Sequence, residues 1–195
     1  MEGITGALFR RAHHAIFGGV TRYYMPFLSP SQNRVFTRRE LQEILPEHNE
    51  GVPAVPQLLT RRSEDFNWAA GELAEMGYRE VNLNLGCPSG TVAAKGKGSG
   101  FLAFREELEA FLEDIFAQAR VEISIKTRLG VSDPEEFVPL LELYRRFPLK
   151  RLIIHPRVQK DQYRGQPRME YFTPAAAGCP FPVSYNGNVY TPAQA

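Results

Sequence analysis

Asn82-Leu83-Asn84-Leu85-Gly86-Cys87-Pro88-Ser89-Gly90 is the stretch from which the fold and chemistry of this chain are best predicted. The alternating apolar run 81–85 indicates a β-strand, and it stops at Gly-Cys-Pro. Pro88 cannot continue a hydrogen-bonded ladder, and Gly86 allows a close backbone approach. The sequence therefore places a thiol at the end of a buried strand. Cys87 is there either as a reactive group or as a small buried hydrophobic residue.

The composition is that of an ordinary globular domain. The 195 residues are 43% hydrophobic and 23% charged, with a formal net charge of +1. No apolar run of about 18 residues is present, so no membrane-spanning helix is expected, and residues 1–4 lack the pattern of a secretion signal. Cys87 and Cys179 are the only cysteines. We therefore expect two reduced thiols in a cytoplasmic protein.

Strand-like and helix-like segments alternate along the whole chain. Strands are expected at residues 22–28, 52–59, 80–87, 121–127, 151–155 and 182–185, and helices at 5–17, 37–45, 63–76, 105–119, 133–146 and 169–177. Thr37 and Glu40 form a capping-box pattern, Ser63 is expected to cap its helix, and Pro134 suits a first helical position. Repeated strand–helix units predict a parallel sheet with helical crossovers.

Polar strand ends favour a closed barrel over an open doubly wound sheet. No G-x-G-x-x-G follows the first strand, as an open dinucleotide-binding sheet would have. A (β/α)8 barrel draws its site from the carboxyl ends of several strands. Polar residues stand at such ends here: Gln57, Asn84, Cys87, Lys126, Arg128, His155, Arg157 and Asn186. Because six strands fall short of eight and 195 residues of about 250, we expect an α/β chain that is an incomplete TIM (β/α)8 barrel, without its first and last strands.

These motifs resemble those of the flavin-dependent tRNA-dihydrouridine synthases over nearly the whole chain. The most specific match is Asn84-x-Gly86-Cys87-Pro88, followed by Val92 and residues 98–102. The other matching segments follow in order at residues 1–5, 55–58, 126–130, 155–157 and 186–187. The resemblance implies that residues 1–195 are a truncated FMN-binding catalytic barrel. The family's last barrel strand and its C-terminal helical tRNA-binding domain are then absent.

The resemblance also implies a reaction. FMN is the expected cofactor, NADPH its expected reductant, and a specific uridine of tRNA the expected substrate. Hydride would pass from reduced FMN to C6 of the uridine, and Cys87 would give a proton to C5, which yields 5,6-dihydrouridine. An ordinary thiol, with a pKa near 8.5, is mostly protonated at neutral pH, as such an acid requires. A nucleophilic Cys87 activated by Lys95 stays open as an alternative.

The resemblance assigns site roles to further residues. Cofactor contacts are expected from Met1, Gln57, Lys126, His155, Asn186 and Gly187, and substrate contacts from Asn84, Lys95, Arg157 and Tyr163. Lys126 suits the end of a flavin where negative charge develops on reduction. The planes of Tyr163 and Arg157 suit a base taken out of its stack. No metal is expected, and the oligomeric state is not predicted.

Each assignment has a structural alternative. Lys126 and Arg128 are alternatively solvated rim charges, and Asn84 alternatively bonds its own backbone. Residues 186–187 are alternatively a plain turn, and residues 95–98 are either a flexible solvated loop or a mobile lid that meets tRNA phosphates. Two other functions also stay open. One is an FMN barrel oxidoreductase acting on a free pyrimidine or an enone, and the other is a non-catalytic RNA-binding remnant.

Overall fold

The computed structural model describes residues 3–191, and its strands and helices alternate as the sequence predicts. The strands are β1 (Tyr23–Leu28), β2 (Ala54–Leu58), β3 (Glu80–Leu85), β4 (Glu122–Arg128), β5 (Arg151–His155) and β6 (Val183–Tyr185). The α-helices are α1 (Ala7–Ile16), α2 (Arg38–Ile44), α3 (Ser63–Glu75), α4 (Gly90–Ala93), α5 (Arg105–Ala117), α6 (Phe137–Arg145) and α7 (Met169–Gly178). Short 3₁₀ helices are η1 (Pro46–His48), η2 (Gly98–Ala103), η3 (Pro134–Glu136) and η4 (Gln159–Asp161). The predicted α/β class is confirmed.

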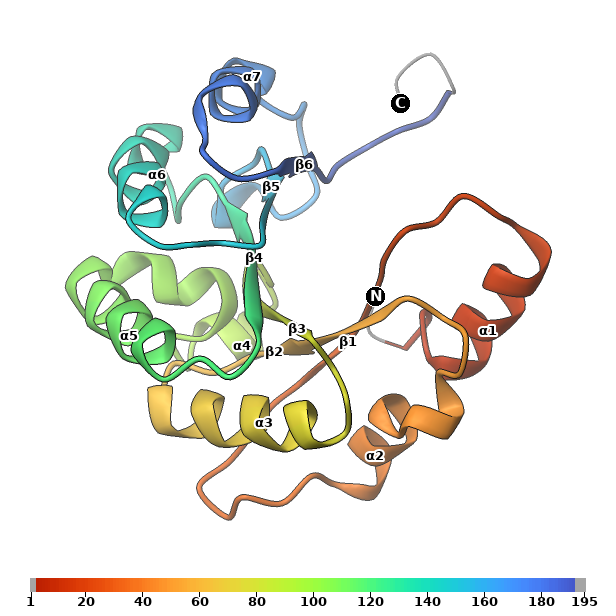
Figure 1. The fold of residues 1–195 in the computed structure, drawn as a ribbon. Helices are drawn as coiled ribbons and strands as arrows, with labels where there is room; N and C mark the ends of the chain where they lie inside the picture. Colours follow the sequence, from red (N-terminus) through yellow and green to blue (C-terminus); the bar gives the residue numbers. More distant parts are fainter. Residues whose placement is uncertain (1–2, 192–195) are drawn as a thin grey trace. The chain divides into compact units, whose positions relative to one another are not determined.

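The chain folds as two compact units, which are described separately here. The first contains the described residues up to Asn84 together with residues 111–123. The second contains residues 85–110 and the described residues from Ser124 onward. Each unit holds a set of parallel strands with helices beside them (Figure 1).

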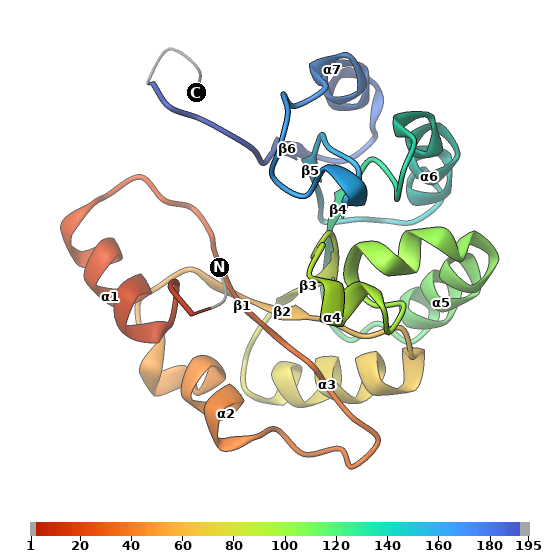
Figure 2. The ribbon, with the colours of Figure 1, turned by 180° about the vertical axis from the view of Figure 1, so that it is seen from behind.

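In the first unit, β2 pairs in parallel with both β1 and β3. The register of β1 against β2 shifts between Tyr24 and Phe27. Two residues of β1 there face Pro56 alone, which has no N–H to give to a ladder. Figures 1 and 2 both show α3 alongside these strands, and its buried residues include Phe66, Ala69 and Leu73.

In the second unit, β5 pairs in parallel with β4 and β6. All five residues of β5 are in register with β4, from Arg151 opposite Ser124 to His155 opposite Arg128. Helix α6 is tied to β4 by a buried 3.0 Å hydrogen bond between the hydroxyls of Tyr144 and Thr127. This register sets the polar ends of β4 and β5 side by side, which is what a site at the carboxyl ends of strands requires.

Helix starts follow local capping chemistry, with one correction. Thr37 and Glu40 form the predicted capping box, and Asp133 caps η3, from which α6 continues. The prediction that Ser63 caps its helix is wrong, because Ser63 is the first residue inside α3 and Arg62 precedes it as the cap residue. Upstream, the Thr60 hydroxyl accepts a hydrogen bond from the Arg62 backbone N–H at 3.1 Å. Within residues 3–191, no helix has the length and apolar character needed to cross a membrane.

Candidate active site

Cys87 lies two residues beyond the end of β3, and the segment after it folds into defined structure. The thiol-bearing residue is half-buried, and neither cysteine of the chain takes part in a disulfide. Residues 95–97 lie between α4 and η2, which pack against each other, and Gly98 is buried. Whether residues 95–98 act as a plain loop or as a lid stays a prediction. A Cβ on Gly98 would lie 2.8 Å from the Cys87 carbonyl oxygen, and this residue has a φ of +57°. Lys95 is exposed.

The two peptide carbonyls on either side of the Cys87 Cα are both hydrogen-bonded. The Gly86 carbonyl accepts from Arg128 Nε at 2.8 Å. The Cys87 carbonyl accepts from Ser99 twice, at 3.1 Å from the backbone N–H and at 2.8 Å from the hydroxyl. Arg128 is 1% exposed and Ser99 is fully buried. Arg128 is therefore not the solvated rim charge that one interpretation of the sequence allowed. Ser99 was not among the predicted site residues, although it lies within the matched segment 98–102.

Lys126 on β4 comes close to the backbone of Gly86, the residue before Cys87. A Cβ built on Gly86 would lie 3.6 Å from Lys126 Nζ, so the ammonium lies against that backbone. Burial, followed by the charge of Arg128, lowers the pKa of Lys126 to about 8, and the neighbouring Cys87 opposes this shift. The structure thus brings together two of the predicted site residues, the thiol of Cys87 and the cation of Lys126.

His155 ends β5 and is held as a neutral ring. Arg157 Nη1 lies 2.8 Å from His155 Nε2, and a guanidinium can only donate, so Nε2 is the acceptor and the ring proton is on Nδ1. Burial, followed by the charges of Arg128, Lys126 and Arg157, lowers the pKa of His155 to about 3. A buried imidazole among cations cannot easily take a second proton.

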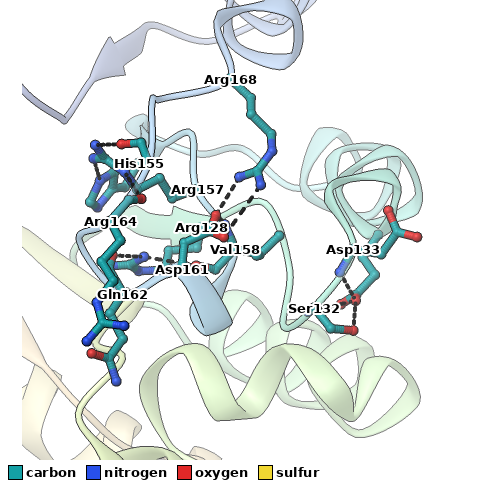
Figure 3. A network of polar contacts seen from close by, with 12 residues as sticks. Arg128, Ser132, Asp133, His155, Arg157, Val158, Asp161, Gln162, Arg164 and Arg168 are labelled. Carbon is teal, nitrogen blue, oxygen red and sulfur yellow. Dashed lines mark hydrogen bonds and ion pairs between the residues drawn. The ribbon is translucent and has the colours of Figure 1, made fainter.

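Arg157 is buried, whereas a residue that stacks on a substrate base would be expected to be accessible. It is 1% exposed, and besides His155 its guanidinium donates to the carbonyls of Arg164 (3.1 Å) and Gly165 (2.7 Å) and to Asn188 Oδ1 (3.2 Å). Figure 3 shows this guanidinium turned toward its protein partners. Arg157 therefore holds His155 and the loop that follows β5, and its expected contact with a substrate base stays a prediction.

Tyr163 lies on that loop, and Figure 3 shows two further arginines, Arg128 and Arg168, that hold it. Arg128 Nη1 donates to the carbonyls of Val158 at 3.1 Å and Gln162 at 2.6 Å. Arg168 pairs with Asp161, and this bond, together with an N–H from Val158, holds the pKa of the Asp161 carboxyl below its usual value. The Tyr163 ring is 72% exposed. It lies 6.2 Å from the His155 ring and 5.4 Å from Arg128 Cζ.

Asn186 and Gly187 follow β6 near this loop. The Asn186 N–H donates to the Ile154 carbonyl at 2.9 Å, which continues the pairing of β5 and β6. A Cβ on Gly187 would lie 2.2 Å from the Tyr185 hydroxyl oxygen, so the space beside Gly187 is filled by this chain. The expected contact with a phosphate stays a prediction.

The first unit carries the remaining predicted residues. Asn84 Nδ2 donates to Gln57 Oε1 at 2.8 Å, and Gln57 Nε2 donates to Asn82 Oδ1 at 2.7 Å. This buried chain of three amides fixes the orientation of the Gln57 side chain, and the bond to Gln57 differs from the own-backbone bond considered for Asn84. Met1 lies outside the described residues.

Residues 1–195 match the family model described as dihydrouridine synthase (Dus). This chain belongs to the dihydrouridine synthase family. A Synechocystis protein named probable tRNA-dihydrouridine synthase 1 is 27% identical over 195 residues, which cover 98% of this chain and 53% of that protein. A Staphylococcus epidermidis protein named probable tRNA-dihydrouridine synthase is 36% identical over 109 residues, covering 56% of this chain and 33% of that protein.

Membership of the dihydrouridine synthase family settles the fold that the strand count left incomplete. The family fold is a TIM barrel, and the strand–helix order described here is that of a partial barrel. The chain spans about half the length of the Synechocystis relative. In the part of the chain that the structure describes, no cluster of three or more His, Cys, Asp or Glu side chains is suited to a metal ion.

Proposed function

We propose that this protein reduces a uridine of tRNA to 5,6-dihydrouridine in the cytoplasm, with FMN as redox cofactor and NADPH as reductant. One observation carries the proposal: in a member of the dihydrouridine synthase family, a half-buried thiol just beyond a strand end lies near the half-buried cation of Lys126, which packs against the preceding Gly86. Relatives that match this chain are named tRNA-dihydrouridine synthases. Because the chain spans about half of the Synechocystis protein, the activity is proposed for the full-length protein.

The donor set of the second unit fits a flavin. Lys126 offers a cation that suits the pyrimidine end of the cofactor. His155 offers Nδ1–H as a neutral donor, because Arg157 occupies Nε2. When bound, FMN would supply the hydride for C6 of the uridine. The resemblance further assigns the backbone of Asn186 and Gly187 to the flavin phosphate.

Cys87 is proposed to give its Sγ proton to C5 of the uridine. The S–H bond breaks, a C5–H bond forms, and a thiolate is left on the enzyme until solvent returns a proton. Lys126 then provides the compensating charge, since the two groups already interact in the structure. A charge that develops beside a fixed cation in a site shielded from water costs less than one that develops alone.

Roles toward tRNA are proposed for exposed residues of the second unit. Tyr163 presents an exposed ring on a fixed loop, and aromatic rings stack on unpaired bases. Lys95 is exposed after α4, where a cation can meet a phosphate. In the first unit, the resemblance alone assigns Gln57 to the flavin and Asn84 to the uracil edge.

The test is a Cys87→Ala variant of the full-length protein beside a Cys179→Ala control. Dihydrouridine is measured by mass spectrometry in tRNA that lacks the modification, and bound flavin by absorbance. We expect Cys87→Ala to lose about 100-fold or more in rate, the scale of a lost general acid, with flavin still bound. Unchanged turnover by this variant contradicts the acid role.

The same assay separates the two rival functions. Turnover of free uracil or of an enone without tRNA favours a small-molecule oxidoreductase. Binding of tRNA by a protein that takes up no FMN and forms no dihydrouridine favours an RNA-binding remnant. The proposal requires flavin uptake and a reaction that depends on tRNA.

A further inference from the structure

We propose that Ser99 and Arg128 are positioning residues that hold the Cys87 thiol in place. Together they fix both peptide carbonyls that flank the Cys87 Cα: Arg128 holds Gly86 and Ser99 holds Cys87 itself. Neither side chain needs to touch substrate or cofactor for this role. We call the hydrogen bonds from Ser99 and Arg128 to these two carbonyls the clamp. Its catalytic consequence rests on the proposed function, whereas the clamp itself can be tested without turnover.

Ser99 is fully buried, and its hydroxyl lies 2.8 Å from the Cys87 carbonyl oxygen. The residue makes two hydrogen bonds to one carbonyl oxygen, from its backbone N–H and its hydroxyl. The glycines on both sides allow this approach, since a Cβ on Gly98 would lie 2.8 Å from the Cys87 carbonyl oxygen and one on Gly100 would lie 2.5 Å from that of Ala93. Both distances are below van der Waals contact. This part of the chain is therefore built to bring Ser99 to Cys87.

Arg128 connects the backbone beside Cys87 to the loop that carries Tyr163. Arg128 Nε donates a hydrogen bond to the Gly86 carbonyl, and Nη1 donates to the carbonyls of Val158 and Gln162. A planar guanidinium can serve carbonyls in separate directions at once, whereas a lysine ammonium is a single point of donation on a flexible stem. Arg128→Lys thus keeps the positive charge and disrupts the geometry. Ser99→Ala changes no charge and removes only the hydroxyl bond.

Positioning matters because the proposed proton transfer requires contact between Sγ and the target carbon. Fixing the carbonyls before and after the Cα restrains the backbone torsions of Cys87 and limits the positions open to its side chain. Misplacement of a reacting atom by about 1 Å costs on the order of 100-fold in rate. Thiol position is therefore the quantity to measure.

The experiment measures alkylation of Cys87 by iodoacetamide in the full-length native protein, with Cys179 as internal reference. Mass spectrometry follows both thiols across a range of pH, and the plateau rate at high pH, where thiolate forms fully, separates accessibility from thiol acidity. In Ser99→Ala and Arg128→Lys we expect the Cys87 plateau rate to rise about threefold or more, the scale of one lost hydrogen bond, and that of Cys179 to stay constant. Arg120→Met is the matched control, because Arg120 is exposed and its guanidinium pairs with exposed Glu75 at 2.6 Å.

Two alkylation results overturn the proposal. One is a Cys87 plateau rate in Ser99→Ala that equals that of the unaltered protein. The other is an equal rise at Cys87 and Cys179, which means general loosening. In the holoenzyme, kcat of Ser99→Ala should fall while its KM for tRNA stays constant, and a rise in KM alone would equally count against positioning. A protein that proves inactive on tRNA still gives the alkylation result, so failure of the clamp and failure of the proposed function are distinguishable.

Discussion

Arg157 donates a 2.8 Å hydrogen bond to Nε2 of His155 and thereby selects the Nδ1–H form of the imidazole ring. The same arginine adds a positive charge to a ring that is already buried near Arg128 and Lys126. Geometry and electrostatics therefore act together, because Arg157 both fixes the tautomer of His155 and disfavours the binding of a second proton to its ring. The ring is left with one donor, Nδ1–H.

His155 should make the stability of the protein depend on pH in a defined window. Its pKa is about 3 in the folded state and near 6.5 in an unfolded chain, so the unfolded state binds more protons between these values. The free energy of unfolding should therefore fall as pH drops from 6.5 toward 3, by on the order of a few kcal/mol from this group. Urea unfolding of the native protein and of His155→Gln across this range checks it. Identical pH slopes in the two proteins would show that His155 contributes nothing.

Lys126 should cost stability at neutral pH. Its pKa falls from 10.5 in the unfolded state to about 8 in the folded state, so the penalty is fully present below pH 8 and shrinks as pH rises toward 10.5. Lys126→Met should raise the free energy of unfolding at pH 7 by roughly 1–3 kcal/mol and weaken FMN binding. Unfolding at pH 7 and near pH 10 measures the difference, with exposed Lys160→Met as control. A variant that is less stable than the native protein at pH 7 would contradict the assignment.

Gly98 should tolerate no side chain. Its φ of +57° and the 2.8 Å approach of a Cβ to the Cys87 carbonyl oxygen both oppose alanine. We expect Gly98→Ala to lower the free energy of unfolding by about 1–3 kcal/mol. Gly90→Ala is the matched control, because nothing lies within 4 Å of its Cβ position and its φ is not positive. Chemical denaturation of both variants decides the matter, and equal stabilities would refute the packing argument.

Local patterns in the sequence were enough to predict the strands and most helices. The strand predicted at 151–155 coincides with β5, because an apolar run between turn-forming residues specifies a buried strand on its own. The prediction that strand ends carry the chemistry also placed Lys126 and Cys87 in one site, since parallel strands align their carboxyl ends.

What the sequence could not predict depends on contacts between distant residues. The segment 88–104 has the glycine- and lysine-rich composition of a loop, and its structure comes from bonds such as that from Ser99 to Cys87. Arg10, Arg128 and Arg157 are all at most 1% exposed, although arginine is ordinarily a surface residue. Only the folded chain brings enough carbonyls and acceptor side chains to each guanidinium to offset the free-energy cost of its burial.

Arg10 provides the sharpest test of such burial. Its guanidinium donates to Glu43 Oε2 at 2.8 Å, to the Glu43 carbonyl at 2.9 Å, to Asn49 Oδ1 at 2.8 Å and to the Thr5 carbonyl at 2.8 Å. Arg10→Met would leave the partly buried Glu43 carboxylate and Asn49 without this donor, at a cost of about 3 kcal/mol in the free energy of unfolding. The neighbouring Arg11→Met should change it by less than about 0.5 kcal/mol, because Arg11 is exposed.

A double-mutant cycle then separates the ion pair of Arg10 and Glu43 from the other contacts of Arg10. If the cost of Arg10→Met comes from the stranded carboxylate, adding Glu43→Gln should recover part of it, because a neutral amide is cheaper to leave buried than a charge. Thermal and urea unfolding of the two single variants and the double variant give the coupling energy, which we expect to be about 1 kcal/mol or more for groups in direct contact. Strict additivity of the two changes would mean that the ion pair at 2.8 Å contributes nothing and that Arg10 acts through its other hydrogen bonds and its packing.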